Sequence, residues 1–447
     1  MGLAEGVRDQ VTARTLAAQA AHRLPSLVVA ISEAGEILHQ VAVGRADVAR
    51  SKPAATDVQY RIGSITKTFT ALAILQLVAE GRLDLQGPLS QGWPGAPDRS
   101  VTLADLLCHG SGMQREPDGG VWEVLEFPRA DQLAEVTERG RALYPAGSWF
   151  HYSNLAYALL GELVAQVTKS PWEDYVRARI LGPLGMSRTT MAPDAPPAQG
   201  YSVAPYTDEV LLEAPIHCQG LSPAAQLWST AEDLCRWSGA LGGSRPEVVP
   251  DEILTQMSSP RVVADLVSWR RAFGLGLMLL RDGDVIYQGH LGSMPGFLAA
   301  VLCHPKSRLG VVVLTNTTAG LDLGALAVEL LSLVRSASRP TEWVPGEAAP
   351  DRIVPLLGRW WSEWSEWLFR WTDGHLEATV AGGASDSATR FAELAPDEFI
   401  AVSGQERGEK LVVVREPGRA GGAVEKLYWA TYPFTREPQP FGPARRP

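Results

Sequence analysis

The sequence predicts a mixed α/β fold: one antiparallel sheet flanked by helices, with a large helical insertion, followed by a small, separate β-barrel domain. Three observations support this prediction. Strand-like segments lie near both ends of the first 338 residues, helical segments broken by Gly and Pro fill the middle, and residues from about 356 to 447 are strand-like with Gly-rich turns. Strands at both ends with helices between them favour a sheet whose first and last strands are neighbours.

The amino-terminal elements follow from local patterns. Residues 3–22 place Ala and Leu at helical spacing and predict a helix. Residues 25–32 and 37–43 are expected to form two strands, joined as a hairpin by a tight turn. A strongly apolar helix is expected over residues 65–79, with Gly81 as its stop signal.

The middle of the chain predicts helices and the next part predicts strands. From about residue 83 to 240 we expect helical segments between Gly- and Pro-rich loops, including helices at 153–168 and 171–180. A last amphipathic helix is expected over 320–336. Before it, four successive antiparallel strands are predicted, at 274–280, 284–289, 297–303 and 309–315.

These elements predict two domains and a linker. Residues 1–338 are expected to form the main domain. Residues 339–355 are a predicted linker, because Pro recurs there at positions 340, 345, 350 and 355. Residues 356–447 are expected to form the small β domain.

Composition excludes several classes of protein. The chain has 447 residues, of which 45% are hydrophobic and 20% charged, so it can bury a large core. Its 40 basic and 50 acidic residues give a net charge of −10 without any basic run, which excludes a surface that follows nucleic-acid phosphates. The four cysteines are far apart and form no CxxC pair, so neither a metal nor a cofactor is expected.

Two features predict the compartment. The amino terminus is polar and lacks the apolar core of a signal peptide. No stretch of about 18 consecutive apolar residues occurs, so no membrane partner is expected. We therefore expect a soluble, cytoplasmic protein.

The first motif with chemical meaning is Gly63-Ser-Ile-Thr-Lys67. If Ser64 begins a helix, Lys67 lies one turn further on the same face. A serine hydroxyl becomes a nucleophile when a neighbouring amine, neutralised by burial, removes its proton. The alternative is an N-cap serine beside a surface lysine, since a Ser-x-x-Lys pattern is expected about once by chance in a chain of this length.

The second motif is Tyr152-Ser-Asn154, just before the helix predicted at 153–168. The chain has only two asparagines, Asn154 and Asn316, so a chance Tyr-x-Asn is uncommon. A phenol beside an ammonium can lose its proton early and act as a base or proton shuttle. The amide at i+2 can hold the lysine and donate to a substrate carbonyl. The alternative is a loop tyrosine and a helix-capping asparagine.

The third motif is Gly289-His-Leu-Gly-Ser-Met-Pro-Gly296, at the junction of two predicted strands. Glycine there, with Gly292 as the candidate substrate-binding position, lets a substrate backbone approach the strand edge. His290 is placed to hydrogen-bond Tyr152 or to take part in proton transfer. The alternative is a hairpin turn with a structural histidine.

These three motifs, in this order, resemble those of the penicillin-recognising serine enzymes: class C β-lactamases, low-molecular-weight penicillin-binding proteins, D-aminopeptidases and related esterases. Further segments that resemble the family are Thr102–Met113, Pro145–Asn154, Leu181–Met186 and Trp228–Leu234. The resemblance implies a β-lactamase/transpeptidase-like fold for the main domain. It also implies that Ser64 is acylated, that Lys67 and Tyr152 handle its proton, and that Asn154 positions the substrate. The N–H groups of Ser64 and Ser293 would form the oxyanion hole.

The third motif departs from the family pattern. The family often has Lys-Thr-Gly there, and the lysine cation binds a substrate carboxylate. Here the segment is His290-Leu-Gly292, as in esterase-like and peptidase-like branches, and an unperturbed histidine is mostly uncharged at neutral pH. Strong recognition of a β-lactam carboxylate is therefore not expected.

The layout most resembles the stand-alone penicillin-binding-protein-type thioesterases, which carry a C-terminal lipocalin-like domain. That resemblance implies release and head-to-tail macrocyclisation of a nonribosomal peptide from a carrier-protein thioester. The carrier protein would then be the partner. An esterase, D-aminopeptidase or β-lactamase-like hydrolase with the same site, and a non-catalytic binding protein on the same scaffold, remain open alternatives.

Two features of the C-terminal segment are also candidates. The tryptophan-rich run from Trp360 to Trp371 can supply either an apolar wall for a substrate or the core of the β domain. Arg436 is a candidate ligand for a peptide carboxylate, because a guanidinium fork matches one.

Overall fold

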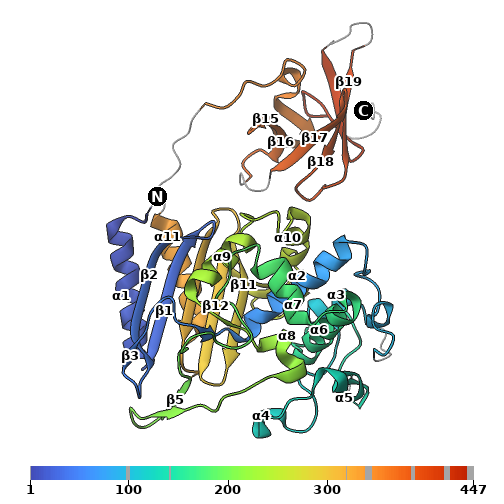
Figure 1. The fold of residues 1–447 in the computed structure, drawn as a ribbon. Helices are drawn as coiled ribbons and strands as arrows, with labels where there is room; N and C mark the ends of the chain where they lie inside the picture. Colours follow the sequence, from blue (N-terminus) through green and yellow to red (C-terminus); the bar gives the residue numbers. More distant parts are fainter. Residues whose placement is uncertain are drawn as a thin grey trace. The chain divides into compact units, whose positions relative to one another are not determined.

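The computed structural model describes residues 2–96, 101–139, 142–318, 320–337, 345–383, 388–416 and 423–439. The chain divides into two compact units, Met1–Ser338 and Arg339–Pro447 (Figure 1). Residues 339–344 of the predicted linker lie outside the described residues. No helix in the described ranges is long and apolar enough to cross a membrane.

The first unit is built on a nine-stranded antiparallel sheet, as the sequence predicts. In the order β3-β2-β1-β13-β12-β11-β10-β9-β8, the first and last long strands are neighbours, with Val29 opposite Val313. This confirms the prediction that strands from the two ends of the unit pair with each other. The strands are β1 (Ser26–Glu33), β2 (Glu36–Asp47), β3 (Lys52–Pro53), β8 (Val262–Val263), β9 (Arg271–Phe273), β10 (Met278–Asp282), β11 (Val285–Met294), β12 (Phe297–His304) and β13 (Leu309–Thr315).

Two strand boundaries differ from the prediction. The strand expected at 274–280 begins only at Met278, because Gly274 and Gly276 turn the chain and Gly276 N donates to the Leu107 carbonyl at 3.2 Å. The strand expected to end at residue 289 continues to Met294. The segment from His290 to Ser293 therefore lies on a strand rather than in a turn. The short strands β8 and β9 were not predicted, because two or three residues show no alternation.

Helices cover both faces of the sheet. One face is covered by α1 (Glu5–Ala21) and α11 (Leu323–Ala337), whose apolar side chains pack with those of β1 and β13. The other face meets α9 (Ala231–Leu241) and the helical insertion, as Figure 1 shows.

Within the insertion, α2 (Thr66–Ala79) and α6 (Asn154–Thr168) pack together at the centre. Every residue of α2 from Thr66 to Leu75 is buried, including Lys67 and three threonines, and the other buried residues of the helix are apolar. The helix predicted at 171–180 is α7 (Trp172–Val176) followed by a π-helical turn, Arg177–Leu181. Shorter helices surround them: α3 (Leu103–Leu107), α4 (Val121–Val124), α5 (Leu133–Arg139), α8 (Ser222–Ala225) and α10 (Asp251–Ser258).

The second unit is a barrel-like sheet of eight antiparallel strands in sequential order. A bridge between Trp361 and Thr435 links its two ends and nearly closes it. Aromatic side chains, including Trp360 and Phe369, fill its core, so the tryptophan-rich run contributes core residues. The strands are β14 (Gly358–Ser362), β15 (Ser365–Thr372), β16 (His375–Val380), β17 (Thr389–Ala395), β18 (Glu398–Ala401), β19 (Lys410–Arg415), β20 (Val424–Trp429) and β21 (Tyr432–Phe434).

Candidate active site

Ser64 lies in a short 3-10 turn, Gly63–Ile65, immediately before α2. Lys67 is in the first turn of α2, one turn beyond Ser64, and its Nζ lies 3.1 Å from Ser64 Oγ. The predicted spacing therefore brings the hydroxyl and the amine together. The hydroxyl lines a pocket, whereas the amine is fully buried.

The environment of Lys67 favours a neutral amine. Its Nζ donates to Asn154 Oδ1 at 2.6 Å and to the Ala224 carbonyl at 2.9 Å. Burial lowers the pKa of Lys67 from 10.5 to about 7, because it removes the ammonium from water; the charge of Glu116 acts in the opposite direction. A substantial fraction of the amine is therefore neutral at pH 7 and can accept a proton from Ser64.

Tyr152 and Asn154 reach the site from the start of α6. Ser153 is the N-cap of α6, with φ −129°, and its Oγ accepts a hydrogen bond from Ala156 N at 3.0 Å. This extended residue separates Tyr152, which precedes the helix, from Asn154, its first residue. The ring centre of Tyr152 lies 4.9 Å from Lys67 Nζ.

Tyr152 is protonated in the resting site. Burial raises the pKa of the phenol well above its ordinary value, and a hydrogen bond with Ser64 offsets only part of this effect. The early loss of its proton that the sequence suggested does not fit this environment. Lys67 is therefore the better base, and Tyr152 is suited to relaying a proton.

Two glycines allow the 3-10 turn that holds Ser64 to contact strand β11. Gly63 has φ +51°, and a Cβ there would lie 2.7 Å from Ser293 N. A Cβ on Gly292 would lie only 1.9 Å from the Ile62 carbonyl oxygen and 3.3 Å from Ser64 N. The two backbones meet because neither glycine has a side chain, and the amides of Ser64 and Ser293 lie on the facing segments. These two amides are therefore candidate donors of an oxyanion hole.

Strand β10 covers only part of the edge of strand β11. Strand β11 pairs with β10 only as far as Gly289, opposite Met278. Beyond that point residues 290–294 pair with β12 alone. An extended substrate can therefore add main-chain hydrogen bonds beside Ser64. The sequence predicted that Gly292 lets a substrate backbone approach this edge. The structure adds a second reason for glycine at this position, which is the close contact with the Ile62 carbonyl oxygen.

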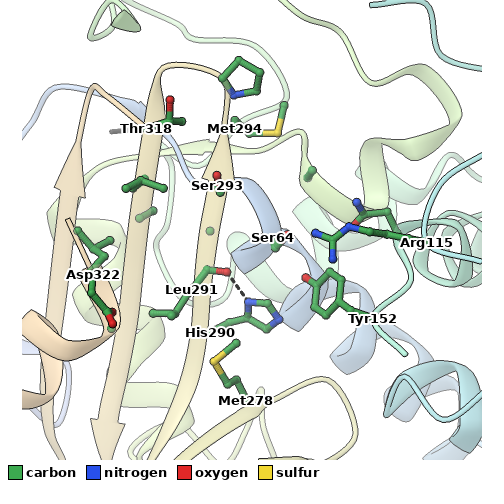
Figure 2. A pocket seen from close by; sticks show the side chains of 18 of the residues that line it. Ser64, Arg115, Tyr152, Met278, His290, Leu291, Ser293, Met294, Thr318 and Asp322 are labelled. Atoms are coloured by element: carbon green, nitrogen blue, oxygen red, sulfur yellow. Dashed lines mark hydrogen bonds between the residues drawn. The ribbon is translucent and has the colours of Figure 1, made fainter. Parts of the chain in front are cut away.

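His290 lines the pocket and its ring lies near that of Tyr152, but the predicted hydrogen bond between them is not present among the described residues. Its Nδ1 interacts with the Leu291 carbonyl at 2.6 Å, its Nε2 makes no hydrogen bond within the described residues, and its ring centre is 6.2 Å from that of Tyr152 (Figure 2). Burial, assisted by the charge of Lys67, lowers the pKa of His290 to about 3. The imidazole is therefore neutral at physiological pH.

Three further residues belong to the site: Arg115 and Glu116 were not singled out from the sequence, and His109 was considered there only as half of a Cys108–His109 pair without a catalytic role. His109 stacks on Tyr152 with ring centres 4.1 Å apart, and its Nδ1 accepts from Ser153 N at 3.1 Å. Arg115 lies over the Tyr152 ring at 5.0 Å, and Glu116 accepts a hydrogen bond from Asn154 Nδ2. All three follow the segment Thr102–Met113 or belong to it, so the family-like phrase was the signal that could have found them.

Around these groups lies a pocket of about 1120 Å³. Its lining combines aromatic side chains such as Phe150 and Phe273 with charged groups such as Arg115 and Arg271. The volume accommodates several residues of a peptide. Within the described ranges, His, Cys, Asp and Glu form no group that could hold a metal ion.

Comparison with known proteins places this chain in a family. The family model described as beta-lactamase matches residues 11–334. The chain belongs to the beta-lactamase family. It is thus a member of the penicillin-recognising serine enzymes, a family of serine hydrolases. Residues 349–436 match a domain of unknown function (DUF7586).

Curated relatives of this beta-lactamase-family chain are distant. Protein flp of Staphylococcus aureus is 28% identical over 309 residues, which cover 66% of this chain and 60% of the relative. Beta-lactamase-like protein 2 of Dictyostelium discoideum is 30% identical over 254 residues, 53% of this chain and 42% of that protein. The chain therefore spans about three fifths of the length of the Staphylococcus relative.

Solved structures confirm the fold. A crystal structure of SurE matches with a TM-score of 0.63 and 24% identity, covering 97% of this chain and 99% of that one. The octameric penicillin-binding protein homologue from Pyrococcus abyssi matches with a TM-score of 0.65 and 21% identity, covering 96% and 99%. D-amino acid amidase from Ochrobactrum anthropi matches with a TM-score of 0.64 and 24% identity, covering 74% and 98%.

Arg436 belongs to the second unit and has partners there. Its guanidinium donates to the carbonyl oxygens of Pro355, Leu357 and Arg359 at 2.5 to 3.1 Å and lies 3.8 Å from the ring centre of Trp360. These contacts indicate a structural role within the barrel-like sheet. Its assignment as a carboxylate ligand stays a prediction.

Proposed function

We propose that this protein transfers acyl groups through an ester intermediate at Ser64, and that its substrate is a peptidyl thioester. The observation that supports the acyl-enzyme most directly is the buried Lys67 amine, with its pKa near 7, 3.1 Å from Ser64 Oγ. A neutral amine at that distance can remove the hydroxyl proton as the oxygen attacks.

In the first half-reaction, Ser64 Oγ bonds to the acyl carbon while Lys67 accepts its proton. The negative charge on the acyl oxygen is stabilised by the N–H groups of Ser64 and Ser293. Tyr152 gives its proton to the leaving sulfur and takes one from Lys67, so the thiol departs neutral and the acyl-enzyme remains. Asn154 holds Lys67 during these transfers, since its Oδ1 accepts from Nζ at 2.6 Å.

In the second half-reaction, the peptide's own amino terminus attacks the ester and gives a head-to-tail lactam, while attack by water gives the linear acid. Two observations favour a nonribosomal peptide held by a carrier protein. These are the two-unit layout, in which a β-lactamase-like unit is followed by a small β unit, and a pocket of about 1120 Å³ beside Ser64. Cyclisation over hydrolysis requires that the pocket hold both chain ends together and exclude water.

The test is intact-mass analysis of the full chain with a synthetic peptidyl thioester, followed by analysis of the released product. We expect a transient mass increase equal to the acyl group and release of cyclic or linear peptide. Ser64→Ala, which removes one oxygen, should show neither. If the wild-type protein gains no mass and releases no peptide but cleaves aryl esters, the thioester proposal is wrong and only the esterase activity stands.

A second candidate uses the same site on amino-acid amides. Among the solved structures of similar fold, one protein is named a D-amino acid amidase and another, from Streptomyces, a D-stereospecific amidohydrolase. The latter is 25% identical with a TM-score of 0.61. A panel of D- and L-amino-acid amides and esters discriminates the two candidates, because an amidase or D-aminopeptidase releases ammonia or a free amino acid from the D-series without needing a peptidyl thioester.

A further inference from the structure

Glu116 stands next to the candidate active site in a fixed position. Its backbone neighbour, Arg115, accepts hydrogen bonds at the start of α6 through its carbonyl oxygen, from Asn154 N at 2.8 Å and Leu155 N at 3.2 Å. The Glu116 side chain lines the pocket and is only 19% exposed. The start of α6 thus holds the carboxylate at the pocket wall.

The two oxygens of the Glu116 carboxylate have different surroundings. Oε1 accepts a hydrogen bond from Asn154 Nδ2 at 2.5 Å and lies 3.8 Å from Arg115 Nε. Oε2 is buried and makes no hydrogen bond within the described residues. Burial of an underbonded carboxylate is costly, and proteins accept such costs mainly where function uses the group.

The chemistry of the partners determines the orientation of the Asn154 amide. A carboxylate only accepts hydrogen bonds, so it requires the amide nitrogen. Lys67 donates, so it requires the amide oxygen, and Nζ lies 2.6 Å from Oδ1. One amide therefore satisfies both neighbours in only one of its two orientations. The result is a chain of contacts from Ser64 through Lys67 and Asn154 to Glu116.

We propose that Glu116 is a positioning residue for acylation at Ser64: it holds the Asn154 amide in the orientation that receives Lys67, and it places a negative charge one amide away from the lysine. The inference rests on the proposed function of Ser64. Glu116 acts through Asn154 and Lys67 and touches no reacting atom.

The charge of Glu116 also affects the pKa of Lys67. It raises the pKa of Lys67 against the larger lowering by burial, whereas the charge of Arg115 lowers it. A neutral residue at position 116 would therefore lower the pKa of Lys67, so the amine would stay neutral down to a lower pH. The titratable groups that face Lys67 from the elements packed around it are His109, Arg115, Glu116, Tyr152, Tyr157, Cys218 and His290.

The test measures the rate constant for labelling of the full chain by a fluorophosphonate, between pH 5 and 9, by intact mass. In this reaction the Ser64 Oγ–P bond forms, fluoride leaves, and the hydroxyl proton passes to Lys67. The variants are Glu116→Gln, which keeps an acceptor without charge, and Glu116→Leu, which removes both. Glu213→Gln is the matched control, because Glu213 lines the same pocket and loses the same charge.

We expect the acid limb of the Glu116→Gln profile to move to lower pH by about one unit, with a plateau within roughly threefold of wild type. Glu116→Leu should lower the plateau about tenfold, because the amide of Asn154 loses the partner that orients it. Glu213→Gln should keep the wild-type acid limb. If Glu116→Leu does not fold, the pH of the acid limb of the Glu116→Gln profile alone tests the role of Glu116.

Two results separate failure of this inference from failure of the proposed function. If wild type is not labelled at any pH, acylation at Ser64 is wrong and the inference falls with it. If wild type is labelled but Glu116→Gln keeps the wild-type limb, or Glu116→Leu keeps the wild-type plateau, only the role of Glu116 is overturned.

Discussion

Replacing Lys67 by methionine tests the buried neutral amine directly. Lys67 is fully buried and its pKa is about 7, compared with 10.5 for an ordinary lysine. In the unfolded chain the amine binds a proton up to about pH 10, whereas in the folded protein it releases that proton near pH 7. The unfolded state therefore binds more protons over this interval, and stability contributed by this group must rise with pH.

The magnitude follows from linkage. Holding Lys67 at the lower pKa costs the folded state roughly 4 kcal/mol at pH 7, and this cost falls as the pH rises. Between pH 7 and pH 9 the relative stability of wild type and Lys67→Met should change by about 2 kcal/mol, in favour of wild type at the higher pH. Contacts that are lost at both pH values cancel in this difference.

The assay is urea denaturation of both proteins at pH 7 and pH 9, read on the transition that the substitution moves, because the two units can unfold separately. Lys169→Met is the control, since Lys169 is exposed. In parallel, Lys67→Met should lose acylation by a factor of about 10³ or more. A stability difference that is the same at both pH values would show that the amine is protonated at neutral pH, and Lys67 could then not be the resting base.

Four further outcomes follow from the site and the barrel. Tyr152→Phe should lower acylation about 10²-fold without lowering the melting temperature, because it removes only the pocket-lining hydroxyl that relays the proton; an unchanged rate would exclude that relay. Gly292→Ala should destabilise the first unit by about 1–3 kcal/mol and slow acylation, because its Cβ would meet the Ile62 carbonyl at 1.9 Å; thermal unfolding measures the first effect and fluorophosphonate labelling the second. His290→Gln should leave the acid limb of the pH–rate profile near pH 7, because the pKa of His290 is already about 3; a limb that moves would assign the titration to the histidine. Arg436→Ala should lower the melting temperature of the second unit and leave hydrolysis of a small aryl ester unchanged; the opposite pattern in calorimetry and ester kinetics would favour a role in substrate binding.

Much of the fold was predictable because its signals are local. The hairpin of β1 and β2 and the helix α2 were expected from apolar patterning and turn residues. The pairing of the terminal strands is not a local feature, and it was expected from the order of the elements along the chain. The end of β11 was not, because Gly289 and Gly292 within a strand resemble turn residues in sequence. The reasons for the two glycines are visible only in the folded protein, where a Cβ on Gly289 would meet the Val301 carbonyl oxygen and a Cβ on Gly292 would meet that of Ile62.

For the site, the sequence alone determined which reactive groups exist and that Ser64 and Lys67 share one turn of chain, because a spacing of three residues is a local property. Only the tertiary structure decided what those groups can do. It brought Asn154 and Glu116 to Lys67, stacked His109 on Tyr152, and removed water from the Lys67 amine and from the imidazole of His290. Proton affinities depend on solvent exclusion and on charges contributed by distant segments, so they emerge only when the chain has folded.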